Sequence, residues 1–227
     1  MNRLIDTAET YVRTIYNLGE DGVIPRRARL SERLGQAGPT VTQTVARLER
    51  DGLIDVTADH HLALTEHGRQ IAVAVTRKHR IAERMLADVI GLPTREVHAE
   101  ASRWEHVISD EAERGIVELL DDPSTSPWGN PIPGLDQLGV EVAHRPPAVR
   151  LAELGRPRSP LPATVRSISE DAQSDDALMA HLVDAGIIPG ARIRVEYRPG
   201  TYLLRGLDAF ELSAKRAHII QLDPIAS

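Results

Sequence analysis

The pattern over residues 27–64 constrains the fold of this chain more than any other feature of its sequence. Residues 27–34 and 39–51 predict two short helices that are joined by a turn containing glycines. A helix, a tight turn and a second helix form the helix-turn-helix motif. Residues 53–56 and 62–64 then predict the two strands of a hairpin. The segment is therefore predicted to fold as a helix-turn-helix followed by a β wing.

Positive charge is concentrated on this same segment. The protein has 227 residues and a formal net charge of -6, which argues against a non-specific binder of polyanions. Residues 26–50 nevertheless contain six arginines against two glutamates, a net charge of +4 on an acidic chain. This local basic surface favours contact with DNA phosphates, although arginine is also an ordinary residue of a solvated helix face.

The second helix of the motif has the composition of a recognition helix, with small and polar residues at its start and arginines further along. Gln43 can bond an adenine edge through both groups of its amide, and Pro39 and the Thr40 methyl group can touch thymine methyls. Arg27 and Arg29, one helix earlier, are suited to the phosphate backbone. The residues expected to contact DNA are Thr7, Arg27, Ala28, Arg29, Pro39, Thr40, Thr42, Gln43, Arg47 and Arg50.

Outside this motif the sequence predicts further helices and then a β module. A first helix is expected over residues 5–18, and long helices over 66–84 and 95–120 with a break at 91–93. One face of the last helix suits either a dimer seam or an internal core, and its residues are Trp104, Val107, Ile108 and Glu111. Strands are expected at residues 165–168, 191–197, 201–204 and 218–222, with a helix at 175–185.

These elements predict a mainly α chain with a small β part, in three domains. The expected limits are 1–73 for the winged helix-turn-helix, 74–140 for a helical domain and 148–227 for a small β-barrel-like domain. Prolines and glycines near residues 139–147 predict a linker before the last domain.

Composition excludes several classes of protein. The chain has neither an apolar run near 18 residues nor a secretory leader, so we expect a cytoplasmic protein with no membrane contact. It has no cysteine, so any metal must bind through nitrogen and oxygen ligands. It has no glycine-rich phosphate loop, nucleophile elbow or HExxH segment, so neither an enzyme nor a small-molecule substrate is expected. A metal-dependent hydrolase and a module that recruits another protein are the weaker alternatives.

Histidines and glutamates recur at helical spacing in the predicted helical domain. His79 and Glu83 lie four residues apart, and His98, Glu105 and His106 share one face of the next predicted helix with Ser102. Two facing helices of this kind can form divalent-metal sites. Each pair alone is more often an ordinary surface pair, so spacing leaves the metal hypothesis near even odds.

Four segments resemble the iron-dependent repressors of the diphtheria toxin repressor family, and the resemblance extends over essentially the whole chain. These segments are residues 37–47, 77–84, 103–106 and 126–134. The resemblance implies a winged-helix domain, a helical dimerisation domain and a C-terminal SH3-like β-barrel. It also implies a homodimer that represses transcription at two-fold operators near iron-uptake genes, with ferrous iron as co-repressor.

Matched position by position, the family's sites are retained here with two substitutions. The ancillary metal site would be His79, Glu83, His98, Glu170 and Gln173, and the oxyanion pocket beside it would be Arg80, Ser126 and Asn130. The primary, activating site would be Thr10, Ser102, Glu105 and His106. Thr10 stands where the family has a methionine and Ser102 where it has a cysteine, so both sulfur ligands are replaced by hydroxyls.

Hydroxyls are harder and poorer ligands than sulfur, so the primary site is expected to bind metal more weakly or to prefer another ion. Three possibilities stay open: a harder site for Mn²⁺ or Fe²⁺, a silent primary site with the ancillary site sensing metal, and DNA binding without metal. Fe²⁺ is the ion that the resemblance favours, Mn²⁺ is an alternative, and Co²⁺, Ni²⁺ or Zn²⁺ are substitutes in vitro. Ala37 and His60 replace a serine and an arginine common near DNA in the family, so operator preference is expected to differ.

Overall fold

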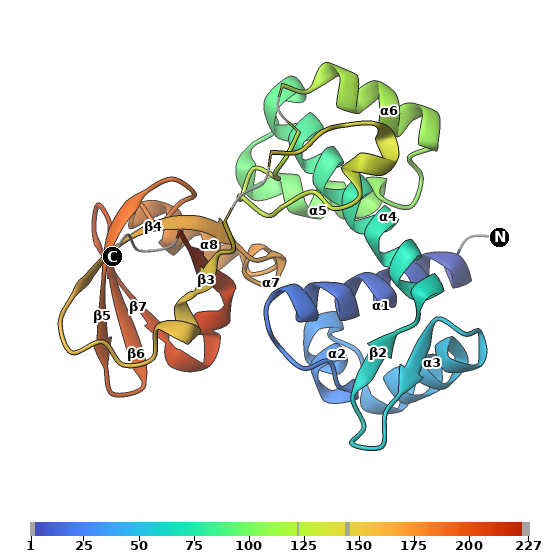
Figure 1. Ribbon diagram of the computed structural model, residues 1–227, viewed down its shortest axis with the longest axis horizontal. Helices are drawn as coiled ribbons and strands as arrows, with labels where there is room; N and C mark the ends of the chain where they lie inside the picture. Colours follow the sequence, from blue (N-terminus) through green and yellow to red (C-terminus); the bar gives the residue numbers. More distant parts are fainter. Residues whose placement is uncertain (1–2, 122, 144–145, 224–227) are drawn as a thin grey trace.

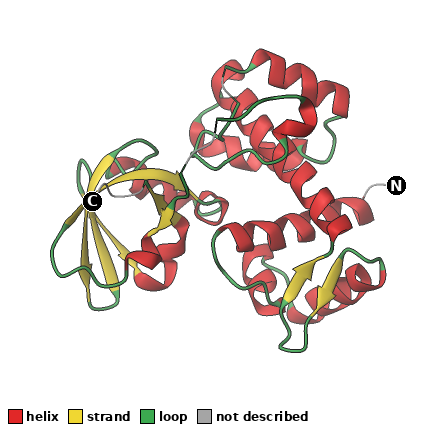
Figure 2. Ribbon diagram, viewed as in Figure 1, coloured by secondary structure: helices red, strands yellow, loops and turns green. Residues whose placement is uncertain are grey.

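The computed structural model describes residues 3–121, 123–143 and 146–223, which form three parts along the chain (Figure 1). The first part contains helices and a hairpin, the middle part is helical, and the last is built on an antiparallel sheet (Figure 2). The elements of the first part are α1 (Arg3–Glu20), α2 (Arg27–Leu34), α3 (Gly38–Arg50), β1 (Ile54–Val56) and β2 (Leu62–Leu64). The predicted winged helix-turn-helix is confirmed.

The helix-turn-helix forms because its apolar residues recur at helical spacing and its turn contains a residue that tolerates a left-handed backbone. Val41, Val45 and Leu48 are buried on one face of α3. Gly35 ends α2 with a φ of 61°, which L side chains rarely adopt, and its N–H donates to the Ser31 carbonyl. The buried face fixes the orientation of α3 and leaves its other face in solvent.

The wing is a short antiparallel hairpin in which Ile54 pairs with Leu64. His60, at its tip, is exposed and adopts a φ of 62°, a left-handed conformation that is uncommon for a residue other than glycine. Gly68 then lets α4 pass close to the wing, because a Cβ atom there would lie 1.9 Å from the Leu53 carbonyl oxygen.

The middle part begins with α4 (Glu66–Arg84), capped by the Thr65 hydroxyl, which accepts a hydrogen bond from the Gly68 N–H. A π-helical segment, η1 (Met85–Ile90), extends α4 to a break at the predicted position. The helices α5 (Thr94–Trp104) and α6 (Asp110–Leu119) follow, and a 3₁₀ turn, η2 (Leu135–Leu138), closes this part.

The predicted continuous helix over residues 95–120 is wrong, because the chain turns between α5 and α6. The Ser109 hydroxyl accepts a hydrogen bond from the Ala112 N–H and so starts α6 as a new helix. Trp104 therefore does not share one helix face with Val107, Ile108 and Glu111, and the Val107 residue is 72% exposed.

The C-terminal part is a six-stranded antiparallel sheet of order β3-β8-β4-β5-β6-β7. Its strands are β3 (Val149–Arg150), β4 (Leu161–Ile168), β5 (Arg192–Arg198), β6 (Thr201–Arg205), β7 (Ala209–Ser213) and β8 (Ile220–Leu222). Its helices are α7 (Glu170–Gln173), α8 (Asp176–Asp184) and the 3₁₀ segments η3 (Leu151–Leu154) and η4 (Ala214–Ile219). The predicted strands and helix are present, whereas β3 and β7 were not predicted because they are short or only partly apolar.

The segment that precedes the predicted linker packs on the C-terminal sheet. Trp128 is buried in the core of that sheet, and its carbonyl accepts a hydrogen bond from the Ile168 N–H at 3.0 Å. Gly129 permits the approach, because a Cβ atom there would lie 2.1 Å from the Arg166 carbonyl oxygen. Of the predicted linker, residues 144 and 145 lie outside the described residues. No helix in the described part of the chain is long and apolar enough to cross a membrane.

Candidate metal centre and nucleic-acid interface

Buried polar side chains gather where α1, α4 and the end of α5 meet α7, which lies beside α1 in Figure 1. Charged residues are seldom buried unless they are paired or bind a ligand. The cluster contains Arg13 and Asn17 of α1, His79, Arg80 and Glu83 of α4, Glu105 after α5, and Glu170 and Gln173 of α7. Three of the predicted sites meet in this cluster.

The predicted ancillary ligands His79, Glu83 and His98 converge in the interior. Glu83 Oε1 lies 3.0 Å from both His79 Nε2 and His98 Nδ1, and these two nitrogens are 3.1 Å apart. Glu83 Oε2 is buried and has no hydrogen-bond partner. Two imidazole nitrogens and a carboxylate with an unpaired oxygen suit a divalent ion of the first transition row.

The charges of this group interact strongly. Burial and Arg13 lower the pKa of His79, but the carboxylates of Glu83, Glu170 and Glu105 outweigh them and raise it to about 9. Burial raises the pKa of Glu83, whereas His79 and His98 lower it to about 2. A metal ion that binds here must therefore displace the proton of His79.

The other two predicted ancillary ligands, Glu170 and Gln173, point elsewhere. Glu170 accepts hydrogen bonds from Arg80 Nε at 2.8 Å, from Asn17 Nδ2 at 2.7 Å and from Arg13. Gln173 Nε2 donates to the Ile168 carbonyl, and Gln173 Oε1 is buried without a partner. Glu170 is thus engaged by cations of the protein itself, while one oxygen of Gln173 stays unpaired.

The predicted primary ligands form a second, more exposed cluster at the N-terminal end of α1. His106 Nε2 lies 3.3 Å from Glu105 Oε1 and 3.4 Å from Thr10 Oγ1. The Thr10 hydroxyl donates to the Asp6 carbonyl, and the Ser102 hydroxyl donates to the His98 carbonyl. Imidazole, carboxylate and hydroxyl donors fit a hard divalent ion, in agreement with the loss of both sulfur ligands.

Two acidic residues near His106 were missed from the sequence. Glu9 Oε2 lies 2.6 Å from His106 Nδ1, and this contact is the largest cause that raises the pKa of His106. Asp6 completes a group of three possible ligand residues with Glu9 and His106. A carboxylate on one ring nitrogen fixes the orientation of the other. The spacing of Asp6, Glu9 and Thr10 at one helical turn was the available signal.

The predicted oxyanion pocket is only partly assembled. Arg80 and Asn130 line one cavity of about 290 Å³, and Ser126 lies outside it. The guanidinium of Arg80 binds both oxygens of Glu20 and one of Glu170, so carboxylates of the protein neutralise its charge. The Asn130 side chain donates to the Ile168 carbonyl.

The predicted DNA-contacting residues of α3 lie on its solvent face. Pro39, Thr40, Thr42, Gln43 and Arg50 are exposed, and Arg47 is half-buried. Ala28 and Arg29 of α2 are also exposed, while Thr7 and Arg27 are partly buried. This surface is continuous with the wing, where Arg26 Nη2 lies 2.7 Å from His61 Nε2.

Arg33 connects the helix-turn-helix to the C-terminal part. It pairs with Asp21 at 2.7 Å and with Asp171 of the C-terminal part at 2.9 Å. Arg150 likewise donates to the Glu20 carbonyl from β3. The C-terminal part is thus bound to the end of α1 and to α2 by charged contacts.

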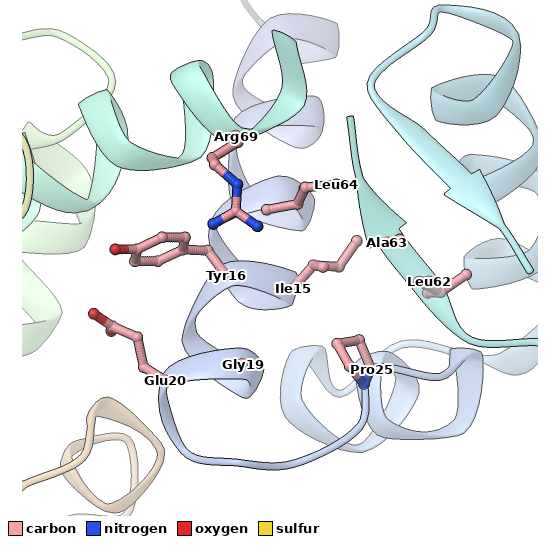
Figure 3. A pocket seen from close by; sticks show the side chains of 9 residues that line it. All are labelled: Ile15, Tyr16, Gly19, Glu20, Pro25, Leu62, Ala63, Leu64 and Arg69. Carbon is pink, nitrogen blue, oxygen red and sulfur yellow. The ribbon is translucent and has the colours of Figure 1, made fainter. Parts of the chain in front are cut away.

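A separate pocket lies between α1, α4 and β2 (Figure 3). Tyr16 and Glu20 of α1 face Arg69 of α4 across it. Burial and the nearby Glu20 raise the pKa of Tyr16 to about 12. None of the predicted metal or DNA ligands lines this pocket.

Two family models match the chain. Residues 3–62 match the N-terminal DNA-binding domain of iron-dependent repressors, and residues 65–134 match their metal-binding and dimerisation domain. The iron-dependent repressor IdeR of Mycobacterium tuberculosis H37Rv is 53% identical over 231 residues, covering 99% of this chain and 100% of the relative. The diphtheria toxin repressor of Corynebacterium diphtheriae is 48% identical over 230 residues, with 99% and 100% covered.

Solved structures agree with this similarity. A manganese-dependent transcriptional repressor in complex with manganese has a TM-score of 0.79 at 28% identity, covering 96% of this chain and 100% of that one. IdeR of T. acidophilum has a TM-score of 0.77 at 25% identity, covering 96% and 97%.

Proposed function

The chain belongs to the iron-dependent repressor family, and from this premise we propose that it represses transcription as a metal-loaded homodimer on two-fold operator DNA. At the level of the family it is a metal-dependent, DNA-binding transcriptional repressor. The ion, the ligands, the operator and the dimer surface are the finer parts of the proposal.

The exposed polar face of α3 is the surface proposed to read base edges in the major groove. Gln43, Thr40 and Pro39 would contact bases, and Arg47 and Arg50 would contact phosphates. Burial of Val41, Val45 and Leu48 on the opposite face supports this orientation. Two such helices in a dimer would read half-sites about one helical turn of DNA apart, or a multiple of it.

A second copy of the chain is proposed to pack against the middle part. Two apolar side chains of the middle part are largely exposed, Val107 at 72% and Leu119 at 66%. Both lie within the match to the metal-binding and dimerisation domain. We place the domain limits at 1–73, 74–140 and 148–227, and the site of action in the cytoplasm, where operator DNA lies.

Two sets of residues are proposed to hold divalent ions, and each supplies nitrogen and oxygen donors. The ancillary set is His79, Glu83 and His98 with Glu170 and Gln173, and the primary set is Glu105 and His106 with the hydroxyls of Thr10 and Ser102. The unpaired buried oxygens of Glu83 and Gln173 support the first set. Fe²⁺ or Mn²⁺ is proposed as the natural ion, with Co²⁺, Ni²⁺ and Zn²⁺ as substitutes.

The position of α1 gives the strongest support to a metal-dependent repressor. α1 packs in the core of the helix-turn-helix through Tyr11 and Val12, and the same helix carries Thr10 and Arg13 into the metal clusters. An ion that draws Thr10 toward His106 and Glu105 would shift α1 and change the spacing of the two recognition helices. Metal affinity and DNA affinity would thereby be coupled.

Titration of chelator-treated protein with each of the five ions, without oxygen and at fixed salt, tests this function against a palindromic duplex. Binding is expected to require metal, with Mn²⁺ and Fe²⁺ the most effective ions. A duplex with scrambled half-sites and the Gln43→Ala variant are the controls, and both should bind at least about tenfold more weakly. Equal binding with and without metal would exclude metal sensing and leave a DNA-binding protein that does not depend on metal.

A further inference from the structure

Arg13 places a buried cation between the two proposed metal sites. Its side chain is only 10% exposed. Nη1 lies 3.0 Å from Glu105 Oε2, and Nη2 donates to Glu170 Oε2. Glu105 belongs to the primary set and Glu170 to the ancillary set, so one guanidinium holds one carboxylate of each site.

Both carboxylates already accept hydrogen bonds from several donors of the protein. Glu170 accepts from Arg80, Asn17 and Arg13, which occupy most of the roughly four positions a carboxylate offers. Glu105 Oε2 also lies 2.6 Å from His79 Nδ1. Positive charge from Arg13 helps to hold the pKa of Glu105 below its ordinary value, against the effect of burial. A metal ion that takes both oxygens of either carboxylate must therefore displace donors that hold it now.

We propose that Arg13 is an internal cation that competes with divalent metal for Glu105 and Glu170, and thereby sets the metal concentration at which the two sites fill. This inference rests on the proposed function. Arginine cannot lose its proton in a protein, so it gives way only by moving. Arg13 Nε is buried without a hydrogen-bond partner, so the guanidinium is not fully satisfied where it lies and loses less by leaving.

Competition through one side chain also links the two sites. An ion that takes Glu170 removes one of the two carboxylates that hold Arg13. The guanidinium is then held by Glu105 alone, so a second ion displaces it more easily. Filling is therefore expected to be positively cooperative, and the cooperativity should depend on Arg13.

Calorimetric titration of the full chain with Mn²⁺ alone, without DNA, tests the inference, with free Mn²⁺ counted by electron paramagnetic resonance. Arg13→Gln removes the charge and is expected to bind Mn²⁺ about tenfold or more tightly than the natural chain, without cooperativity. Arg77→Gln is the matched control, since Arg77 is also buried on a glutamate, Glu113, which belongs to neither set of proposed ligands. It should leave Mn²⁺ affinity unchanged. Unchanged or weaker Mn²⁺ binding by Arg13→Gln would overturn the inference.

Loss of a buried cation beside two carboxylates can also unfold the metal-free protein. Arg13→Lys then serves as the second variant, because it keeps the charge but cannot hold both carboxylates with one planar group. It is expected to bind Mn²⁺ a few-fold more tightly than the natural chain, and equal or weaker binding contradicts the inference. If the natural chain itself binds no divalent ion, the proposed function fails; if it binds and the variants match it, only the role of Arg13 fails.

Discussion

The two proposed metal clusters meet at α5 and differ in how their donors are held. In the ancillary trio, His79 and Glu83 are fully buried, and both are ligand residues that the sequence predicted. In the primary cluster, Thr10, Ser102 and His106 are half-buried, and both hydroxyls donate to carbonyls of their own helices. A buried cluster and a more exposed one thus lie side by side, with Glu105 in contact with His79 of the first and with His106 of the second.

Substitution of His79 is expected to have the largest effect, because His79 connects the two clusters. His79→Gln removes the ring that contacts Glu83, His98 and Glu105, and so takes one partner from each of the two buried carboxylates. Metal affinity is expected to fall on the order of 100-fold or more, and DNA binding with it. Calorimetry and duplex binding measure both. Lys78→Ala, at the neighbouring position where the side chain pairs with Asp110 instead, should change neither, and an equal loss there would point to general instability.

Low pH should weaken the binding of metal by the buried ancillary trio. Because the pKa of His79 is raised to about 9, an ion must displace a proton below that pH, and Mn²⁺ affinity should fall about tenfold per pH unit. In the metal-free protein the sign is opposite. Stability from His79 is complete below its ordinary pKa of 6.5 and is lost as pH rises through about 9. Titrations at several pH values and thermal melts without metal measure the two trends, and a flat affinity profile would contradict the first.

Sulfur ligands at positions 10 and 102 should shift the ion preference of the primary cluster toward softer metals. The Thr10→Met, Ser102→Cys double variant is expected to gain about tenfold in affinity for Co²⁺ and Ni²⁺ relative to Mn²⁺. Competition titrations measure the ratio. Thr14→Met, one turn further along α1, is the matched control, because the Thr14 hydroxyl donates to the Thr10 carbonyl and Thr14 is not among the proposed ligands. A similar gain in that control would show that the primary cluster is not responsible.

The smallest expected effect concerns Glu9, which contacts His106 of the primary cluster. Glu9→Gln replaces the carboxylate that lies 2.6 Å from His106 Nδ1. Loss of this orienting contact is expected to weaken metal binding at the primary cluster by a few-fold to about tenfold, with the ancillary trio unaffected. Electron paramagnetic resonance of bound Mn²⁺ can separate the two sites. A loss confined to the ancillary trio would be the opposite result.

Much of the site was within reach of the sequence, since helical spacing puts His79 and Glu83 on one face and predicts the exposed residues of α3. The orientation of Glu170 was not, because it depends on Arg13, Asn17 and Arg80, which are far away in the chain. Glu9 was missed for the same reason, because its partner His106 lies in the turn after α5, far away in the sequence.

Local spacing, turn residues and composition are enough to specify the helix-turn-helix, the wing and the donor types available to a metal. Three features depend instead on how distant segments pack: where α5 stops, which cation each buried carboxylate faces, and how Arg13 comes to lie between the clusters. These outcomes depend on long-range packing, in which a buried charge must find its partner wherever the fold places one.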